Sequence, residues 1–259
     1  HPNNHINMSQ STNDVYPTAI KLTLHELIYK LKDALRFLRD CFEEKAIEFK
    51  DVLKMGRTQL QDAVPMTLGQ EFKTFAVMID DDIYRLRNVQ ALLKEVNLGA
   101  TAIGTGINTK ASYQRKVISN LREVTGVDYV SAGDLIEATQ DTGSFVHISG
   151  MLKSVAIKIS KICNDLRLLS SGPRAGFNEI NLPPLQPGSS IMPGKVNPVM
   201  PEVVNQVAFE VIGADMTISM ASEGGQLQLN VFEPLIAYKL FTSINMMRRA
   251  FYSLGEKCI

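Results

Sequence analysis

Two stretches of the sequence carry apolar residues at alternating spacings of four and three. The first run consists of Leu24, Ile28, Leu31, Leu35, Leu38 and Phe42. The second consists of Phe145, Ile148, Leu152, Val155, Ile159, Ile162, Leu166 and Leu169. This alternation is typical of a helix that buries one seam against neighbouring helices, whereas a half-buried strand alternates every second residue. We therefore expect both runs to be core faces of long helices.

Three further helices are predicted, over residues 67–97, 203–221 and 235–254. The first has a charged outer face, which we expect in solvent; its charges are Asp80, Asp81, Asp82, Arg85 and Arg87. The second contains only Glu210 and Asp215 as charges, and a helix that is apolar nearly all round should be buried on all sides. The chain is therefore predicted to be all-α, an elongated bundle of about five long helices.

The charge balance and the cysteines narrow the class of protein. The 259 residues include 27 basic and 27 acidic side chains, so nothing indicates a nucleic-acid partner or a membrane surface. No stretch is long and apolar enough to span a bilayer. Cys41, Cys163 and Cys258 have no metal-type spacing, and reduced thiols in a cytoplasmic protein are the simplest account of them.

Residues 188–198 are the most informative segment for function. They read Gly-Ser-Ser-Ile-Met-Pro-Gly-Lys-Val-Asn-Pro, which is too rich in glycine and proline for a helix or a central strand. The segment is therefore predicted to be a loop. Its two hydroxyls, lysine and asparagine suit an anionic substrate, although an ordinary surface connector with an incidental lysine would also fit the composition.

Two other clusters of short polar side chains could bind the same kind of ligand. Ser11, Thr12 and Asn13 precede a helix that is expected to open near Pro17, where helix capping is the alternative role. Thr58 and Gln59 lie in a glycine-containing connector between the first two helices, where loop hydrogen bonding is the alternative.

A glycine-rich stretch around Gly104 and Gly106 has a superficial similarity to a phosphate loop. Its glycine spacing fits neither dinucleotide pattern, and no βαβ unit surrounds it. We therefore interpret it as a tight crossing between helices near the candidate site.

Three motifs together resemble the aspartase/fumarase superfamily. Besides residues 188–198, Asn7-Met8-Ser9-Gln10-Ser11-Thr12-Asn13-Asp14 resembles the Ser-Thr-Asn segment of that family, and Gly56-Arg57-Thr58-Gln59-Leu60-Gln61-Asp62-Ala63 resembles its Gly-Arg-Thr segment. The resemblance covers essentially the whole chain. It implies that residues 1–259 are the central helical-bundle domain, with the smaller N-terminal and C-terminal family domains missing. It also implies a homotetramer that places the apolar helices in a common core and builds each active site from three subunits.

The resemblance also implies a role for each candidate residue. Ser189 would be the catalytic base that removes a proton from the carbon next to a carboxylate. The substrate-binding residues would be Ser11, Thr12, Asn13, Thr58, Gln59, Ser190, Lys195 and Asn197, with Glu202 in a supporting role. Hydroxyls, amides and backbone N–H groups suffice to stabilise the doubly charged intermediate, so we expect no metal ion and no organic cofactor.

Gln59 distinguishes between the reactions of the superfamily. Fumarases and some aspartases carry a histidine at this position, paired with a glutamate at the position of Glu202. Glutamine cannot shuttle a proton but can hydrogen-bond an ammonium or carboxylate group. Elimination of ammonia from L-aspartate to give fumarate is therefore the expected reaction. The alternatives are a class II fumarate hydratase, another amino-acid lyase, or a catalytically inactive helical assembly module.

Overall fold

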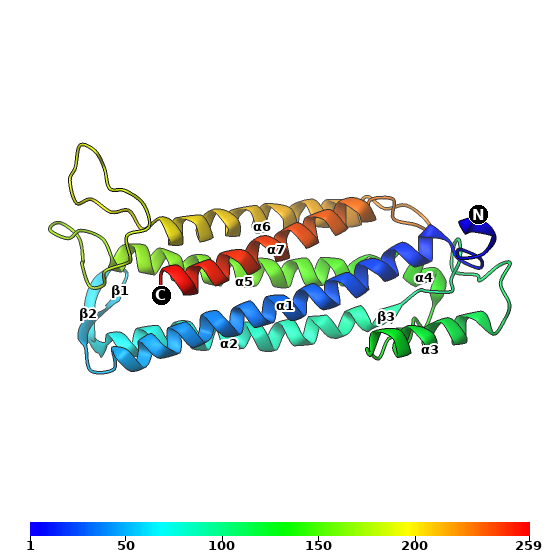
Figure 1. Cartoon of the computed structure of the whole chain (residues 1–259), viewed down its shortest axis with the longest axis horizontal. Helices are drawn as coiled ribbons and strands as arrows, with labels where there is room; N and C mark the ends of the chain where they lie inside the picture. Colours follow the sequence, from blue (N-terminus) through cyan, green and yellow to red (C-terminus); the bar gives the residue numbers. More distant parts are fainter. The chain divides into compact units, whose positions relative to one another are not determined.

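A computed structural model describes all residues from 1 to 259 and divides the chain into two compact units. Unit 1 comprises His1–Tyr29, Arg87–Met151 and Gly213–Thr242, and unit 2 comprises Lys30–Leu86, Leu152–Ile212 and Ser243–Ile259. Five long helices each contribute a segment to both units. They are α1 (Thr12–Glu48), α2 (Leu68–Ala91), α5 (Gly143–Leu169), α6 (Val199–Glu223) and α7 (Glu233–Lys257), labelled in Figure 1. The all-α prediction with five long helices is confirmed.

The remaining elements are short. Two helices, α3 (Tyr113–Thr125) and α4 (Leu135–Gln140), lie between α2 and α5 along the chain, and single 3₁₀ turns cover Pro2–Asn4 and Leu92–Lys94. Strands β1 (Leu53–Thr58) and β2 (Gln61–Thr67) form an antiparallel hairpin between α1 and α2. Strands β3 (Glu95–Val96) and β4 (Val130–Ser131) form a two-residue parallel pair.

Both predicted apolar seams form the cores of the units. Every residue of the two runs is at most 5 % exposed. In unit 2 the ring of Phe42 on α1 packs against Phe72 and Phe75 on α2, with centroid separations of 6.0 and 5.6 Å. Full burial of one such side chain contributes about 1.5–3 kcal/mol to the free energy of unfolding. The packing of these seams, rather than helix propensity, therefore supplies most of the stability of the helices.

Unit 1 has its own small core beside the short parallel strands. Val96, Leu98, Ile118 and Tyr129 form a buried cluster. The glycine-rich stretch that follows is a tight crossing, as expected, because a Cβ on Gly104 would lie 2.4 Å from the Ile136 Cα atom of α4. No βαβ unit accompanies it. Glycine is required at this position because the backbone of α4 leaves no room for a side chain.

The structure corrects one residue of the predicted solvent-exposed charged face on α2. Asp80 and Asp81 are exposed, but Asp82 is fully buried. Lys158 on α5 donates a hydrogen bond of 2.6 Å to the Asp82 carboxylate, and Arg85 contacts the same oxygen at 3.3 Å. A buried charge is tolerated when a partner of opposite charge contacts it. The helical periodicity of α2 places Asp82, unlike Asp80 and Asp81, on the face that packs against α5.

In the single chain α6 is not buried on all sides, so its expected full burial would require the predicted tetramer. Val204, Val211 and Ile218 are buried, but Phe209, Met216 and Met220 are more than 60 % exposed. The other helices of the chain cover one face of α6 only, which leaves an apolar face in contact with solvent.

The chain contains neither a candidate membrane span nor a candidate metal cluster. No helix combines the length and the apolar character needed to cross a bilayer. No group of three or more histidine, cysteine or acidic side chains is arranged to hold a metal ion. The three cysteines are free thiols.

Candidate active site

The Ser-Thr-Asn segment forms the N-terminus of α1 in unit 1. Ser11 caps the helix, because its hydroxyl accepts a hydrogen bond of 3.2 Å from the Asn13 backbone N–H. In return, the Asp14 carboxylate accepts a bond of 2.9 Å from the Ser11 N–H. This reciprocal arrangement is a capping box, so the capping role is real for Ser11. It also fixes the directions in which the three polar side chains leave the helix end.

Asn13 is held by a contact that is distant in sequence. Its side-chain amide donates a hydrogen bond of 2.7 Å to the carbonyl of Ala102, and its amide oxygen accepts one of 3.3 Å from the Thr12 hydroxyl. Thr12 is exposed, whereas Ser11 and Asn13 are half-buried. These bonds use one of the two amide protons of Asn13 and the hydroxyl proton of Thr12, and leave the other amide proton and the acceptor sites of the Thr12 oxygen unused.

Thr58 and Gln59 lie at the tip of the β1–β2 hairpin in unit 2. Thr58 pairs with Gln61, and the two residues between them, Gln59 and Leu60, have φ angles of 54° and 63°. Two consecutive positive φ angles are typical of the turn that matches the twist of a two-residue hairpin. Thr58 and Gln59 are both exposed. The predicted connector between the first two helices is therefore an antiparallel hairpin with Gln59 at its tip.

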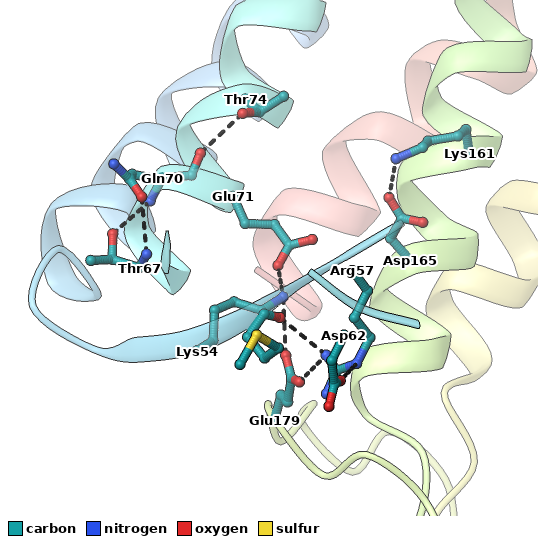
Figure 2. A network of polar contacts seen from close by, with 11 residues as sticks. Lys54, Arg57, Asp62, Thr67, Gln70, Glu71, Thr74, Lys161, Asp165 and Glu179 are labelled. Atoms are coloured by element: carbon teal, nitrogen blue, oxygen red, sulfur yellow. Dashed lines mark hydrogen bonds and ion pairs between the residues drawn. The ribbon is translucent and has the colours of Figure 1, made fainter. Parts of the chain in front are cut away.

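A network of ion pairs fastens this hairpin to the segment that leads to the Gly-Ser-Ser loop (Figure 2). Arg57 of β1 donates a hydrogen bond to Glu179, and its guanidinium lies 4.4 Å from the centroid of the Phe177 ring. Lys54, also of β1, contacts the same carboxylate at 3.0 Å and pairs with Glu71 on α2. Figure 2 shows Lys54 and Arg57 converging on Glu179 from the strand.

Glu179 is the central residue of this network, because its carboxylate pairs with both Arg57 and Lys54. Burial disfavours the charged carboxylate, but the hydrogen bonds from Arg57 and Lys54 outweigh burial and hold the pKa of Glu179 below its usual range. The residue therefore stays ionised at neutral pH and keeps the hairpin attached.

The Gly-Ser-Ser loop connects α5 to α6 in unit 2 and is mostly exposed. Ser189 is half-buried, and its hydroxyl accepts a hydrogen bond of 3.3 Å from the Ile191 N–H. Ser190, Lys195 and Asn197 are exposed. A Cβ on Gly188 would lie 2.6 Å from the carbonyl oxygen of Lys195, so the two ends of this loop touch through backbone atoms. The predicted loop is confirmed.

Glu202 lies in the first turn of α6, just after the loop. Its N–H donates a hydrogen bond of 3.3 Å to the carbonyl of Pro198, and its side chain is half-exposed. No hydrogen bond or ion pair joins Glu202 to Gln59, or either of them to Ser189. Within unit 2 the contacts of Arg57 and Lys54 with Glu179 hold the hairpin against the segment that precedes the loop, and no such contact joins the candidate residues of the hairpin to those of the loop.

Sequence reasoning missed several residues that hold the candidate segments. Glu179 and Lys54 carry no motif, and the partners of Glu179 are more than a hundred residues away in the chain. Asp14 could have been found, because an acid three residues after a serine N-cap is the signature of a capping box.

A lyase family model matches residues 1–213 of the chain. The chain belongs to this lyase family. Three curated relatives, all aspartate ammonia-lyases, are similar to the whole chain. The relatives are from Helicobacter pylori strain 26695 (61 % identical over 259 residues), Escherichia coli K12 (60 % over 258) and Pseudomonas aeruginosa PAO1 (63 % over 263). Each alignment includes 100 % of this chain and 54 or 55 % of the relative. The chain thus spans about half the length of the curated relatives it matches.

Solved structures of the lyase family share the fold. A fumarate lyase:delta crystallin from Brucella melitensis bound to cobalt superposes with a TM-score of 0.98 at 57 % identity, covering 100 % of this chain and 56 % of that one. A recombinant class II fumarase from Schistosoma mansoni gives 0.95 at 34 % identity, with 100 % and 57 % coverage. The expected family and the all-α fold are confirmed.

Proposed function

We propose that this chain is the central part of an enzyme that eliminates ammonia from L-aspartate to give fumarate. The observation that carries the proposal is 60 to 63 % identity to aspartate ammonia-lyases over the whole chain. Gln59 at the hairpin tip supports elimination over hydration, because an amide binds an ammonium or carboxylate group but cannot relay a proton to or from water.

In the proposed reaction Ser189 is the base. Its alkoxide takes a proton from the carbon next to the substrate's β-carboxylate, and the electron pair spreads onto that carboxylate as an aci-carboxylate. The C–N bond then breaks and ammonia leaves. The N–H of Ile191, which already donates to the Ser189 hydroxyl, is placed to stabilise the alkoxide, and the nearby Lys195 supplies positive charge.

The developing double charge of the intermediate requires fixed hydrogen-bond donors. We assign this role to the side chains of Ser11, Thr12, Asn13, Thr58, Ser190 and Asn197, together with Lys195 as a point charge. All of them except Ser11 and Asn13, which are half-buried, are exposed in the single chain. Glu202, half-exposed in the first turn of α6, supports the site from the far end of the loop. The proposed chemistry employs no metal ion or organic cofactor.

We also propose that the protein is a homotetramer in which three subunits contribute to each site, and that it is cytoplasmic. The exposed apolar face of α6, with Phe209, Met216 and Met220, supports assembly, because an isolated chain would leave it in water. Three free thiols support a reducing compartment. Light scattering tests the assembly: a tetramer is expected for the 259-residue chain, and Phe209→Lys should shift it toward smaller species. A monomeric unsubstituted chain would contradict the proposal.

The activity is tested by the ultraviolet absorbance of fumarate with the whole protein that carries this chain. Absorbance should rise with L-aspartate and stay flat with L-malate, and Ser189→Ala should abolish the rise. Fumarate from L-malate alone would favour a class II fumarate hydratase instead. The 259-residue chain by itself should turn over weakly or not at all, because it spans about half the length of its relatives and each donor that the other half supplies would be worth about 3–4 kcal/mol of transition-state stabilisation.

A further inference from the structure

Asp14 is a buried carboxylate that joins two segments far apart in the sequence. It is fully buried in unit 1. Its Oδ1 atom accepts the Ser11 N–H at 2.9 Å, and its Oδ2 atom accepts the N–H groups of Gly99 and Thr101 at 3.0 and 3.1 Å. The Asp14 carboxylate is stabilised by these three backbone N–H donors. The N-terminal end of α1 also favours a negative charge at this position.

Asn97 reinforces the same junction from the other side. Its side-chain amide donates hydrogen bonds of 3.1 Å to the Asn13 carbonyl and to the Thr139 hydroxyl. The bond from the Asn13 side chain to the Ala102 carbonyl completes the connection. Residues 11–14 are thus held to residues 97–102 through the backbone and the side chain of Asn13.

The backbone opposite Asp14 is in an unfavourable conformation. Gly99 has a φ of 96°, which glycine adopts without penalty, but Thr101 has a φ of 62°. A β-branched residue in the left-handed region is uncommon, costs about 1–3 kcal/mol, and persists only where its surroundings fix it. The hydrogen bond from the Thr101 N–H to Asp14 is the contact that fixes it.

We propose that Asp14 and Asn97 are positioning residues for the substrate site. They act through Asn13 and Ser11 by holding the N-terminal turn of α1 in the orientation that binds the substrate. This inference rests on the proposed function of the Ser-Thr-Asn segment. A carboxylate is required at residue 14 because both of its oxygens accept, whereas the amide group of an asparagine would turn a donor toward at least one of the three N–H groups.

The test is Asp14→Asn in the whole protein, assayed with L-aspartate. We expect kcat/KM to fall about 100-fold, with KM raised and kcat lowered together, because the donors are displaced by a fraction of an ångström rather than removed. Circular dichroism and light scattering should be unchanged. Asp82→Asn is the matched control: it is another fully buried carboxylate, paired with Lys158 in unit 2, and should lower stability while leaving both kinetic constants intact.

A double-mutant cycle with Asn13→Ala separates positioning from plain stabilisation. If Asp14 acts through Asn13, adding Asp14→Asn to Asn13→Ala should cost far less than Asp14→Asn costs alone. Additive losses, or kinetic constants for Asp14→Asn like those of the unsubstituted protein, would overturn the proposal. Should Asp14→Asn not fold, Asn97→Ala is the deciding variant. A fall in kcat/KM of about 10-fold that disappears in the Asn13→Ala background would support positioning, and full activity of Asn97→Ala would overturn it. An unsubstituted protein that releases no fumarate from L-aspartate would instead overturn the proposed function and, with it, this inference.

Discussion

Arg57 and Glu179 form the contact that ties the β1–β2 hairpin to the segment leading into the Gly-Ser-Ser loop. The guanidinium of Arg57 bonds the Glu179 carboxylate and stacks beside Phe177, while Lys54 holds the same carboxylate from another direction. Both side chains are largely buried, so the pair is weakly screened by solvent. The hairpin is therefore tied to residues 177–179, which precede the Gly-Ser-Ser loop along the chain, by contacts that neither motif encodes.

Replacing Arg57 by alanine should destabilise unit 2 and disturb catalysis. Glu179 would keep only Lys54 as partner, and the loss of a partly buried charged hydrogen bond should lower the free energy of unfolding by about 1–3 kcal/mol. Urea denaturation measures this, and the aspartate assay should show a reduced kcat/KM. Lys73→Ala, which removes an exposed ion pair with Glu43 in the same unit, should cost at most about 1 kcal/mol. Equal effects of the two variants would contradict a special role for Arg57.

Ser189→Ala should leave folding intact and lower kcat by about 10²–10⁴-fold, since a general base contributes that much. KM should change little, because the hydroxyl is needed for proton removal rather than for holding the substrate. Steady-state kinetics of the whole protein measure both constants. Ser170→Ala is the control: Ser170 lies at the start of the same connection, and its hydroxyl donates a hydrogen bond to the Arg167 carbonyl. Turnover near that of the control would remove Ser189 from the role of base.

Lys195→Ala should raise KM and lower kcat together. The ammonium group is proposed to contact a carboxylate both in the bound substrate and in the transition state, so its loss weakens both. Lys195→Arg should recover part of the binding but less of the turnover, because the planar guanidinium places its charge differently. An unchanged kcat/KM in the alanine variant would mean that Lys195 points into solvent in the complex.

The stability of the protein should depend on pH through Glu233, the first residue of α7. Burial raises the pKa of this carboxyl to about 7, against an opposing attraction from Lys21. The folded state therefore binds the proton more tightly than the unfolded state, whose pKa is about 4.3. The stabilising effect of protonation is present at low pH and is lost as pH rises from about 4.5 to 7.

Glu233→Gln tests this linkage by thermal denaturation at several pH values. The variant should gain up to about 3 kcal/mol over the parent at pH 8 and little at pH 4, because glutamine has no proton to lose. Glu223→Gln, the last residue of α6, is a control that should leave the pH profile as it is. A profile for Glu233→Gln that parallels the parent would contradict the assignment.

Thiol reagents should distinguish the three cysteines. Burial raises the pKa of Cys163 and Cys258, the latter to about 11, so neither supplies thiolate at neutral pH. Cys41 is partly exposed and should react first in the native protein, although its pKa is also raised. Peptide mapping after brief alkylation should find label at Cys41, and at all three only after denaturation. Early labelling of Cys163 would show that its part of the core opens readily.

The sequence was sufficient to predict the helices but not the side-chain contacts between them. A repeat of threes and fours depends only on helical geometry, so the buried seam from Leu24 to Phe42 could be read directly. The burial of Asp82 could not be foreseen, since it depends on Lys158 reaching across from another helix. The exposure of Phe209 in the single chain has a related cause: the composition of α6 indicates that its apolar face needs to be covered, but not whether the same chain or another copy covers it.

The candidate site was predictable as three segments and not as an arrangement. Glycine and proline content marked residues 188–198 as a loop, and Ser11 was recognisable as a cap. The attachment of these segments depends on Glu179 and Asn97, which contact Arg57 and Asn13 across more than eighty residues of sequence. Such contacts leave no local pattern in the sequence.

The approach of Gly188 to the Lys195 carbonyl has a consequence for the conformations open to the Gly-Ser-Ser loop. Residues 189–194 leave and return through a narrow neck where the backbones of Gly188 and Lys195 meet, so the two ends of this segment already lie together. Ordering these residues around a ligand would therefore lose little additional loop-closure entropy. Any side chain at residue 188 would force the two sides of the neck apart, because its Cβ would lie 2.6 Å from the Lys195 carbonyl oxygen. The ends of residues 189–194 would then no longer be held together.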